Sequence, residues 1–272
     1  MKCAFNLVMG LGALLLLPVY NLPAQEGAIS GQNLSPPPLF PALTGSDFRD
    51  CFVNQASLAF VEKHTAGMEY FLRFGMPELA IKSLFYTGPF GGIAFGFRYS
   101  GYGFTELMYH HFSVAGGMSV SGSLAVGVEA SVNTASSSSD EAATISASGQ
   151  IGLIYSVSES TSLGIHLVNP VPDRLRDNPL PSALRVGAGT SVTDRASVSA
   201  MLEKSSHRPL SAAAGLSYDI TQATTIRAGF DTGTASLGFT AVFRFTGFTC
   251  SLSFVTHSRL GLSPVAALSK SF

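Results

Sequence analysis

Alternation between apolar and small or polar residues runs through the chain from residue 66 to residue 272. In the segment 124–130, for example, Leu124, Val126 and Val128 alternate with residues that are small or charged. Successive side chains of a β-strand point to opposite faces, so this period of two predicts strands with one apolar face. We count about 14 such segments. The region 66–272 is therefore predicted to be all-β.

Two all-β architectures alternate in this way, and they differ in what lies opposite the apolar face. In a soluble β-sandwich the second face is wet and carries many Lys, Glu and Thr residues. Here that face is mostly Gly, Ala and Ser, and only 12% of all residues are charged, about half of the roughly 25% usual for a soluble domain. We therefore predict a transmembrane antiparallel up-and-down β-barrel, whose apolar face meets lipid. A soluble exported β-sandwich is the alternative.

The connections between the predicted strands support the barrel. The two longest, 133–141 and 169–181, follow the fifth and seventh strands, whereas the connections after even-numbered strands are short. Outer-membrane barrels have an even number of strands, short periplasmic turns and longer external loops. With a periplasmic N-terminus, this parity is the one that a barrel requires.

The first 24 residues have the layout of a secretory signal peptide. Met1-Lys2 gives a positive start, residues 4–17 are largely apolar, and Ala24 supplies a small residue at the expected cleavage point. A lead-in rich in proline and glycine follows, and then a segment, 47–60, that does not alternate and could form a short helix or turn. The predicted divisions are 1–24, 25–65 and 66–272, and the protein is predicted to be exported after cleavage.

Composition excludes several classes of protein. The net charge of −1 argues against the basic patch that a nucleic-acid partner requires. No apolar run of roughly 18 residues follows the N-terminal segment, which excludes a bundle of transmembrane helices. Cys51 and Cys250 could form a disulfide in an exported protein, but their different surroundings favour two unbridged thiols.

Charged residues occur singly on the small-residue face of many predicted strands. In a barrel they would point inward, where they could pair with one another or line a polar pore. Apolar residues on the same face, such as Phe71, Val168 and Val242, leave room for a hydrophobic conduit. The lumen-facing candidates are Glu69, Arg73, Lys82, Arg98, Glu129, Arg185, Arg227, Asp231 and Arg244.

Motifs for catalysis and metal binding are lacking. On a strand, His110 and His111 point to opposite faces and cannot share a metal ion by themselves, and His166 is expected to face the interior. The chain has no Gly-x-Ser-x-Gly element. We therefore predict no catalytic residue, no metal and no cofactor, and a protein that is not an enzyme.

Two predicted external loops have distinctive sequences. Residues 136–140 are serine-rich and are expected to form a solvated loop. Residues 173–177 carry charges of both signs and are bracketed by four prolines, which restrict the backbone. This stiff loop could cover the barrel mouth or bind a partner.

The last strand ends Leu268-Ser269-Lys270-Ser271-Phe272. A final strand ending on Phe resembles the C-terminal signal that the barrel-insertion machinery of Gram-negative bacteria reads. This resemblance implies that Phe272 contacts that machinery and that the protein resides in the outer membrane, with outer-membrane lipid around it.

A short element before the first strand carries a family resemblance. Asn54-Gln55-Ala56-Ser57-Leu58-Ala59 resembles the Asn-Pro-Ala-x-Leu-Ala element of two related groups, with Gln55 in place of Pro. One group is the PorV/PorQ-like outer-membrane proteins associated with type IX secretion, and the other is the FadL-like long-chain fatty-acid transporters. Segments 163–170, 181–187 and 257–261 also look like the PorV/PorQ-like group. The resemblance implies a barrel of about 14 strands whose plug motif, Asn54, Gln55 and Ala56, packs inside.

Two functions remain open at this point. We predict transport of a small solute, with a hydrophobic solute favoured by the apolar inner residues. The alternative is an accessory or shuttle subunit of a protein secretion system, whose partners would be secretion-system components.

Overall fold

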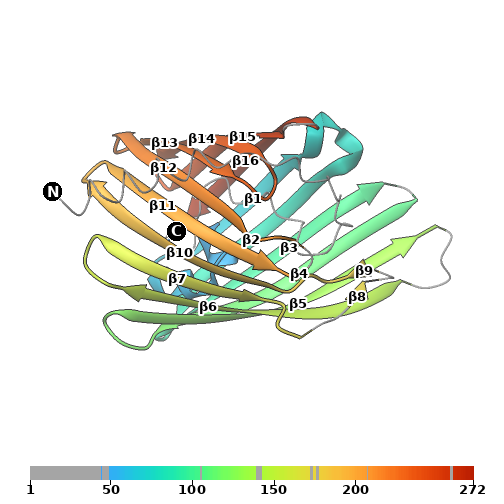
Figure 1. The fold of residues 1–272 in the computed structure, drawn as a ribbon, viewed down its shortest axis with the longest axis horizontal. Helices are drawn as coiled ribbons and strands as arrows, with labels where there is room; N and C mark the ends of the chain where they lie inside the picture. Colours follow the sequence, from blue (N-terminus) through green and yellow to red (C-terminus); the bar gives the residue numbers. More distant parts are fainter. Residues whose placement is uncertain are drawn as a thin grey trace.

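The computed structural model describes Thr44 and residues 49–104, 106–138, 143–171, 174–175, 178–206, 208–257 and 260–272. Fourteen antiparallel strands form one closed barrel, in which each strand pairs with its neighbours in the sequence and β1 pairs with β16 (Figure 1). The predicted barrel is thus confirmed, and the β-sandwich alternative is wrong. None of the helices in the described residues is long and apolar enough to cross a membrane.

The bounds of the barrel strands follow the predicted alternation. They are β1 (Thr65–Leu72), β2 (Ala80–Phe90), β3 (Ile93–Phe104), β4 (Leu107–Ser119), β5 (Leu124–Ser137), β6 (Thr144–Ser156), β7 (Thr161–Val168), β10 (Ala183–Thr193), β11 (Ala196–Ser205), β12 (Ser211–Thr221), β13 (Thr224–Asp231), β14 (Ser236–Phe245), β15 (Phe248–His257) and β16 (Gly261–Ser271). A separate hairpin consists of β8 (Arg174–Leu175) and β9 (Asn178–Pro179).

The two ends of the barrel differ in their connections. Turns of two to four residues follow β2, β4, β6, β10, β12 and β14, and they lie at the end where β1 begins and β16 ends (Figure 1). We call this the turn end. The opposite end, the loop end, carries the β8–β9 hairpin and the short helices η4 (Arg73–Gly75) and η5 (Pro77–Leu79). The predicted parity is therefore confirmed, although β5 extends to Ser137 and shortens the predicted 133–141 connection.

Large apolar side chains cover the outer face of the barrel. On β3, Phe95 and Phe97 are more than 40% exposed while the intervening Gly96 and the following Arg98 are buried inside. Met68 on β1 and Val128 on β5 are more than half exposed. Soluble proteins rarely expose a continuous apolar surface of this extent. In a closed barrel, such a belt is the surface that lipid covers.

Aromatic contacts stabilise the pairing between the first and last strands at the turn end. The His64 ring stacks about 6 Å from the rings of both Tyr86 and Phe272, and its Nδ1 lies 2.8 Å from the Tyr86 hydroxyl. The Phe272 amide also donates a 2.9 Å hydrogen bond to the His64 carbonyl oxygen. These contacts extend the β1–β16 pairing beyond the last ladder residue.

No disulfide links Cys51 and Cys250, as predicted. Cys51 is buried inside the barrel, whereas Cys250 lies on β15 between the inward-facing Thr249 and Ser251 and therefore faces outward.

Candidate functional site: a plugged barrel lumen

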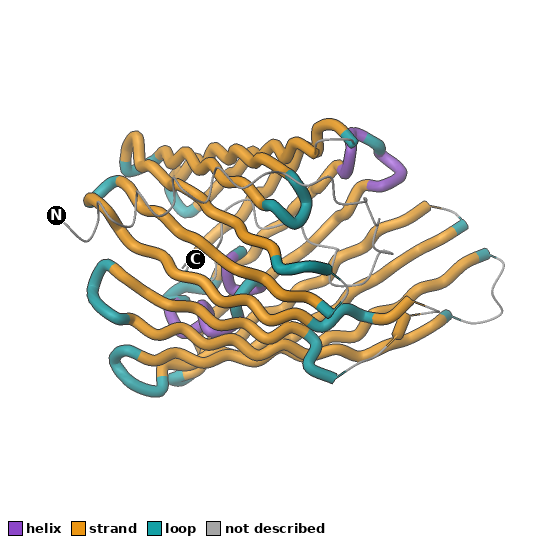
Figure 2. The backbone as a smooth tube through the Cα atoms, in the orientation of Figure 1, coloured by secondary structure: helices purple, strands orange, loops and turns teal. Residues whose placement is uncertain are grey.

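A short helical segment occupies the lumen at the turn end. Residues Asp50–Phe60, which we call the plug, form two 3-10 helices, η2 (Asp50–Phe52) and η3 (Gln55–Phe60), drawn in purple inside the barrel in Figure 2. Asn54 caps η3, because its backbone is extended and its side-chain oxygen accepts a 3.2 Å hydrogen bond from the Ala56 amide. Asn54, Gln55 and Ala56 are fully buried. The segment implied by the family resemblance therefore packs inside.

Three inward-facing glycines form the seat of the plug. Gly117, Gly127 and Gly152 lie directly opposite one another on β4, β5 and β6. A Cβ atom on Gly117 would lie 2.6 Å from the Gln55 carbonyl oxygen, and one on Gly127 or Gly152 would overlap Gln55 or Asn54. Glycine at all three positions is therefore what lets the plug backbone approach the wall. We call these residues the glycine seat.

Gln55 ties the plug to this wall through its side chain. Its Nε2 atom donates a 3.2 Å hydrogen bond to Glu129, and Gln150 on β6 donates a 2.8 Å hydrogen bond to the same carboxylate. The Asn54 amide donates to the Leu153 carbonyl oxygen at 3.3 Å. Proline has no comparable donor, so the Gln55 replacement adds a polar anchor to a buried carboxylate.

Further contacts connect the plug to other strands around the lumen. Arg49, just before the plug, pairs with Glu69 on β1 at 3.0 Å. The Phe52 ring lies 5.9 Å from the Phe85 ring on β2 and 5.5 Å below the Arg98 guanidinium. On the opposite wall, Val53 packs against Met201 of β11 and Ala213 of β12. The plug therefore reaches from one wall of the lumen to the other.

A chain of polar side chains lies above the plug, on the side of the loop end. The Arg98 guanidinium donates to Nε2 of His111 at 3.0 Å, so the ring proton lies on Nδ1, which donates to Asn133 at 2.8 Å. Asn133 in turn donates to the Ser148 hydroxyl at 3.3 Å. His111 is fully buried and His110 faces outward, as the predicted opposite orientations require. Sequence reasoning did not predict this chain, because its members come from four strands.

The predicted lumen-facing residues fall into three groups. The inward positions of their strands hold Glu69, Arg98, Glu129, Arg185, Arg227, Asp231 and Arg244. Arg73 lies in η4, just beyond β1, with its guanidinium over the Phe74 ring. The prediction for Lys82 is wrong: Lys82 is exposed between the buried Ile81 and Ser83 and points outward.

Two of the inward-facing arginines pair with side chains on strands β10–β14. Arg185 on β10 lies directly opposite Glu203 on β11, and their charged atoms are 2.6 Å apart. Arg244 on β14 donates to the Thr225 hydroxyl at 2.7 Å. His166 also faces inward and is fully buried, and neither of its ring nitrogens has a hydrogen-bond partner among the described residues.

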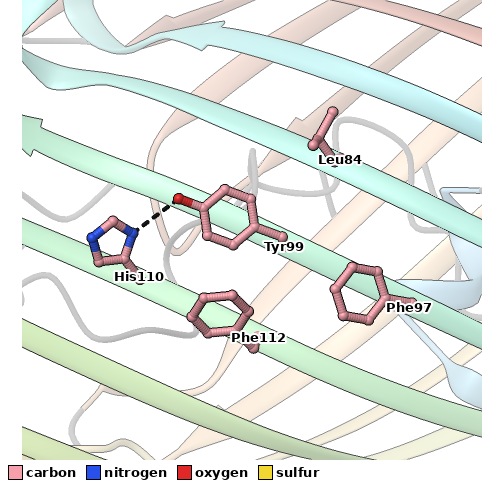
Figure 3. A pocket seen from close by; sticks show the side chains of 5 residues that line it. All are labelled: Leu84, Phe97, Tyr99, His110 and Phe112. Atoms are coloured by element: carbon pink, nitrogen blue, oxygen red, sulfur yellow. Dashed lines mark hydrogen bonds between the residues drawn. The ribbon is translucent and has the colours of Figure 1, made fainter.

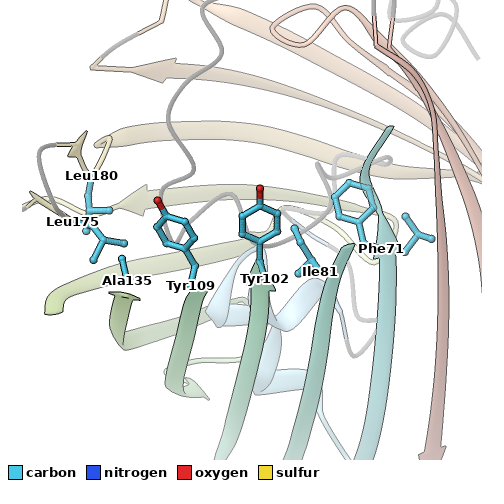
Figure 4. Close-up of a cluster of buried hydrophobic side chains, with 8 residues drawn as sticks. Phe71, Ile81, Tyr102, Tyr109, Ala135, Leu175 and Leu180 are labelled. Carbon is cyan, nitrogen blue, oxygen red and sulfur yellow. The ribbon is translucent and has the colours of Figure 1, made fainter. Parts of the chain in front are cut away.

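An apolar cluster lines the mouth at the loop end. Phe71, Ile81, Tyr102, Tyr109, Ala135 and Val265 project inward from β1–β5 and β16, and the connection after β7 adds Leu175 and Leu180 (Figure 4). We call this group the mouth cluster. It is the largest buried apolar cluster among the described residues.

The connection after β7 is fastened over the mouth by Asn169. Asn169 adopts a left-handed backbone conformation (φ 46°), and its side chain donates a 3.1 Å hydrogen bond to the Leu180 carbonyl oxygen. The Ser182 hydroxyl donates to the Asn169 carbonyl oxygen at 2.6 Å. These bonds hold Leu175 and Leu180 against the barrel, which fits the predicted mouth-covering role of the proline-bracketed loop.

Of the charged residues 173–177, Asp173, Arg176 and Asp177 lie outside the described residues, as do 139 and 140 of the serine-rich loop.

Comparison with solved structures identifies the same barrel in other proteins. The Ralstonia pickettii toluene transporter TbuX is similar at a TM-score of 0.64 and 13% identity, covering 82% of this chain and 93% of that one. The P. putida toluene transporter TodX gives 0.63 and 13%, covering 80% and 92%. A Pseudomonas aeruginosa FadL homologue gives 0.61 and 12%, covering 86% and 95%. At such low identity the likeness establishes the fold. The sequence matches no known family model and no curated protein.

Proposed function

We propose that this protein is an outer-membrane barrel that transports a small hydrophobic solute. The mouth cluster carries the proposal. Its two tyrosines, one phenylalanine and several aliphatic side chains face the lumen where a solute would enter from outside (Figure 4). A mainly apolar surface with a few hydroxyl groups suits a solute that is poorly soluble in water. The toluene transporters and the FadL homologue with the same fold support this proposal.

The plug defines the step that follows entry. It contacts both walls of the lumen at the turn end, so a solute collected at the mouth must pass the plug or displace it. The polar chain from Arg98 to Ser148 lies between the mouth cluster and the plug. This order of surfaces, apolar and then polar, would admit hydrophobic molecules one at a time and slow the passage of bulk water and ions through the lumen.

Uptake measurements test the proposal. Cells that express the protein should take up a labelled monoaromatic hydrocarbon faster than cells without it, with no gain for a sugar of similar size. Replacing Tyr102 by Ser in the mouth cluster should lower hydrocarbon uptake, while the matched Tyr218→Ser change on the outer face of β12 should not. Equal uptake by both variants and the unmodified protein would argue against transport through the mouth.

A second candidate is an accessory subunit of a secretion system, resembling the PorV/PorQ-like group. The observation in its favour is local: β7 ends at Val168 and β10 begins at Ala183, so the two matching segments, 163–170 and 181–187, flank one mouth loop. Co-purification of exported proteins with the barrel, without hydrocarbon uptake, would favour this candidate.

Signal cleavage after Ala24 and recognition of Phe272 by the insertion machinery stay predictions, and residues 1–24 lie outside the described part of the chain. Proteomic identification of the mature N-terminus tests the cleavage.

A further inference from the structure

A groove lies on the outer face of the barrel, away from the lumen. It is shallow and open, and it is lined by Leu84, Phe97, Tyr99, His110 and Phe112 from β2, β3 and β4 (Figure 3). All five residues occupy outward positions of their strands. This groove is therefore part of the surface that the membrane covers, and the transport proposal makes no use of it.

Aromatic contacts hold the His110 imidazole in place at one end of the groove. The Tyr99 ring lies 4.9 Å from the Phe112 ring and stacks on His110 at 6.0 Å with an interplanar angle of 17°. The Tyr99 hydroxyl lies 2.9 Å from Nδ1 of His110 (Figure 3). When the hydroxyl donates to Nδ1, the ring proton lies on Nε2 and is available to an acceptor outside the protein.

A lysine lies on the same cross-strand row as His110. Lys82 on β2 pairs in register with Gly101 on β3, and Gly101 pairs with His110 on β4. Gly101 adds no side chain between them, and the Tyr99 hydroxyl covers it, 2.9 Å from where a Cβ atom of Gly101 would lie. The Lys82 ammonium makes no hydrogen bond or ion pair with the rest of the described chain. An unpaired cation on a lipid-facing surface is costly unless its charged end reaches an anionic headgroup.

The position of this row indicates which side of the membrane it faces. Lys82 is the third residue of β2 and His110 the fourth of β4, both counted from the loop end. The loop end of an outer-membrane barrel faces the outside. Lys82 and His110 therefore lie near the outer headgroup layer, and the apolar groove continues below them toward the middle of the membrane.

We propose that Lys82 and His110 bind a phosphate of lipid A in the outer leaflet, with one acyl chain in the groove formed by Leu84, Phe97 and Phe112. Three observations converge on this occupant: a lysine without a partner in the described chain, a neighbouring imidazole whose Nε2 can donate, and an aromatic groove directly below. The proposal goes beyond solute transport and holds whatever passes through the lumen. It also accounts for Lys82 on a face that is otherwise apolar.

Native mass spectrometry of the purified barrel tests the headgroup site. The folded protein in detergent is titrated with lipid A, with phosphatidylglycerol and with phosphatidylcholine, and bound lipid is counted. We expect lipid A to bind tightest. Lys82→Gln together with His110→Gln should weaken it by at least about fivefold, the loss expected for one headgroup lysine. The matched control is Lys270→Gln, an outward lysine near the turn end that lies over the Phe248 ring.

A second pair of variants tests the acyl groove. Leu84→Trp should fill the groove and reduce lipid A binding, whereas Leu237→Trp, at an equally exposed outward position on β14, should not. Each variant is first shown to fold by its heat-modifiable band on a gel. Equal affinity for all three lipids, or an equal loss in the Lys270→Gln control, would overturn the proposal. Phosphatidylglycerol binding as tightly as lipid A would overturn the choice of lipid A.

Discussion

Both walls of the lumen carry rows of small residues, but the two rows have different roles. On β4–β6, glycines at adjacent positions receive the plug backbone, and polar side chains from the same strands tie it down. On β10–β14, a comparable row of Gly189, Ser199, Gly215, Gly229 and Gly238 is aligned in register. Its members on β10, β12 and β13 are only partly buried.

This difference indicates that the plug is anchored asymmetrically. The hydrogen bonds of Asn54 and Gln55 and the closest backbone contacts of the plug involve β4, β5 and β6, while Val53 provides an apolar contact to β11 and β12. The following changes test this asymmetry, beginning with the largest expected effect.

Shortening the two plug residues that face opposite walls should have unequal consequences. Leu58 is fully buried against β3 and β4, so Leu58→Ala should cost about 2–5 kcal/mol of plug packing, and the partly buried Val53→Ala about 1 kcal/mol. Conductance in planar bilayers should show frequent openings for Leu58→Ala and few for Val53→Ala. Similar opening by both variants would remove the asymmetry.

Enlarging a glycine on each wall gives a second comparison. Gly127→Leu should overlap the plug backbone and displace it, at a cost of about 1–3 kcal/mol. In a Cys250→Ser background, the thiol of Cys51 in the plug should then react with a maleimide roughly 5–150-fold faster. Gly215→Leu, on the opposite wall, should leave Cys51 protected. Fast labelling in the second variant would show that the plug also depends on that wall.

Removing one carboxylate from each wall should produce the smallest difference. Glu129→Ala leaves the buried Gln55 and Gln150 amides without their acceptor, at a cost of about 1–3 kcal/mol. Glu203→Ala breaks a partly exposed pair with Arg185 and should cost about 0–1 kcal/mol. The temperature at which the folded band disappears on a gel measures both. We expect the larger drop for Glu129→Ala.

The barrel could be predicted from the sequence because the alternation with a period of two shows which residues face the lipid. It fails at Lys82 because both faces of β2 are apolar there. Ile81 and Phe85 point inward, to the mouth cluster and to Phe52 of the plug, while Leu84 and Tyr86 point outward. Apolarity alone then cannot fix the phase of the strand.

The glycine seat and the polar chain lie beyond sequence reasoning for another reason. Each depends on the register between strands, which places Gly117 opposite Gly127 and brings His111 to both Arg98 and Asn133. Residues that are far apart along the chain become neighbours only after the register is set. The plug element was an exception, because its signal is local and lies directly before β1.

The short connection between the plug and β1 restricts how the lumen can open. Four residues, 61–64, separate the end of η3 from the start of β1. Fully extended, they span about 14 Å at most. The plug therefore stays within about this distance of the start of β1, at the turn end. Whatever movement opens the lumen, β1 keeps the displaced segment close to the glycine seat, so the plug can return there quickly.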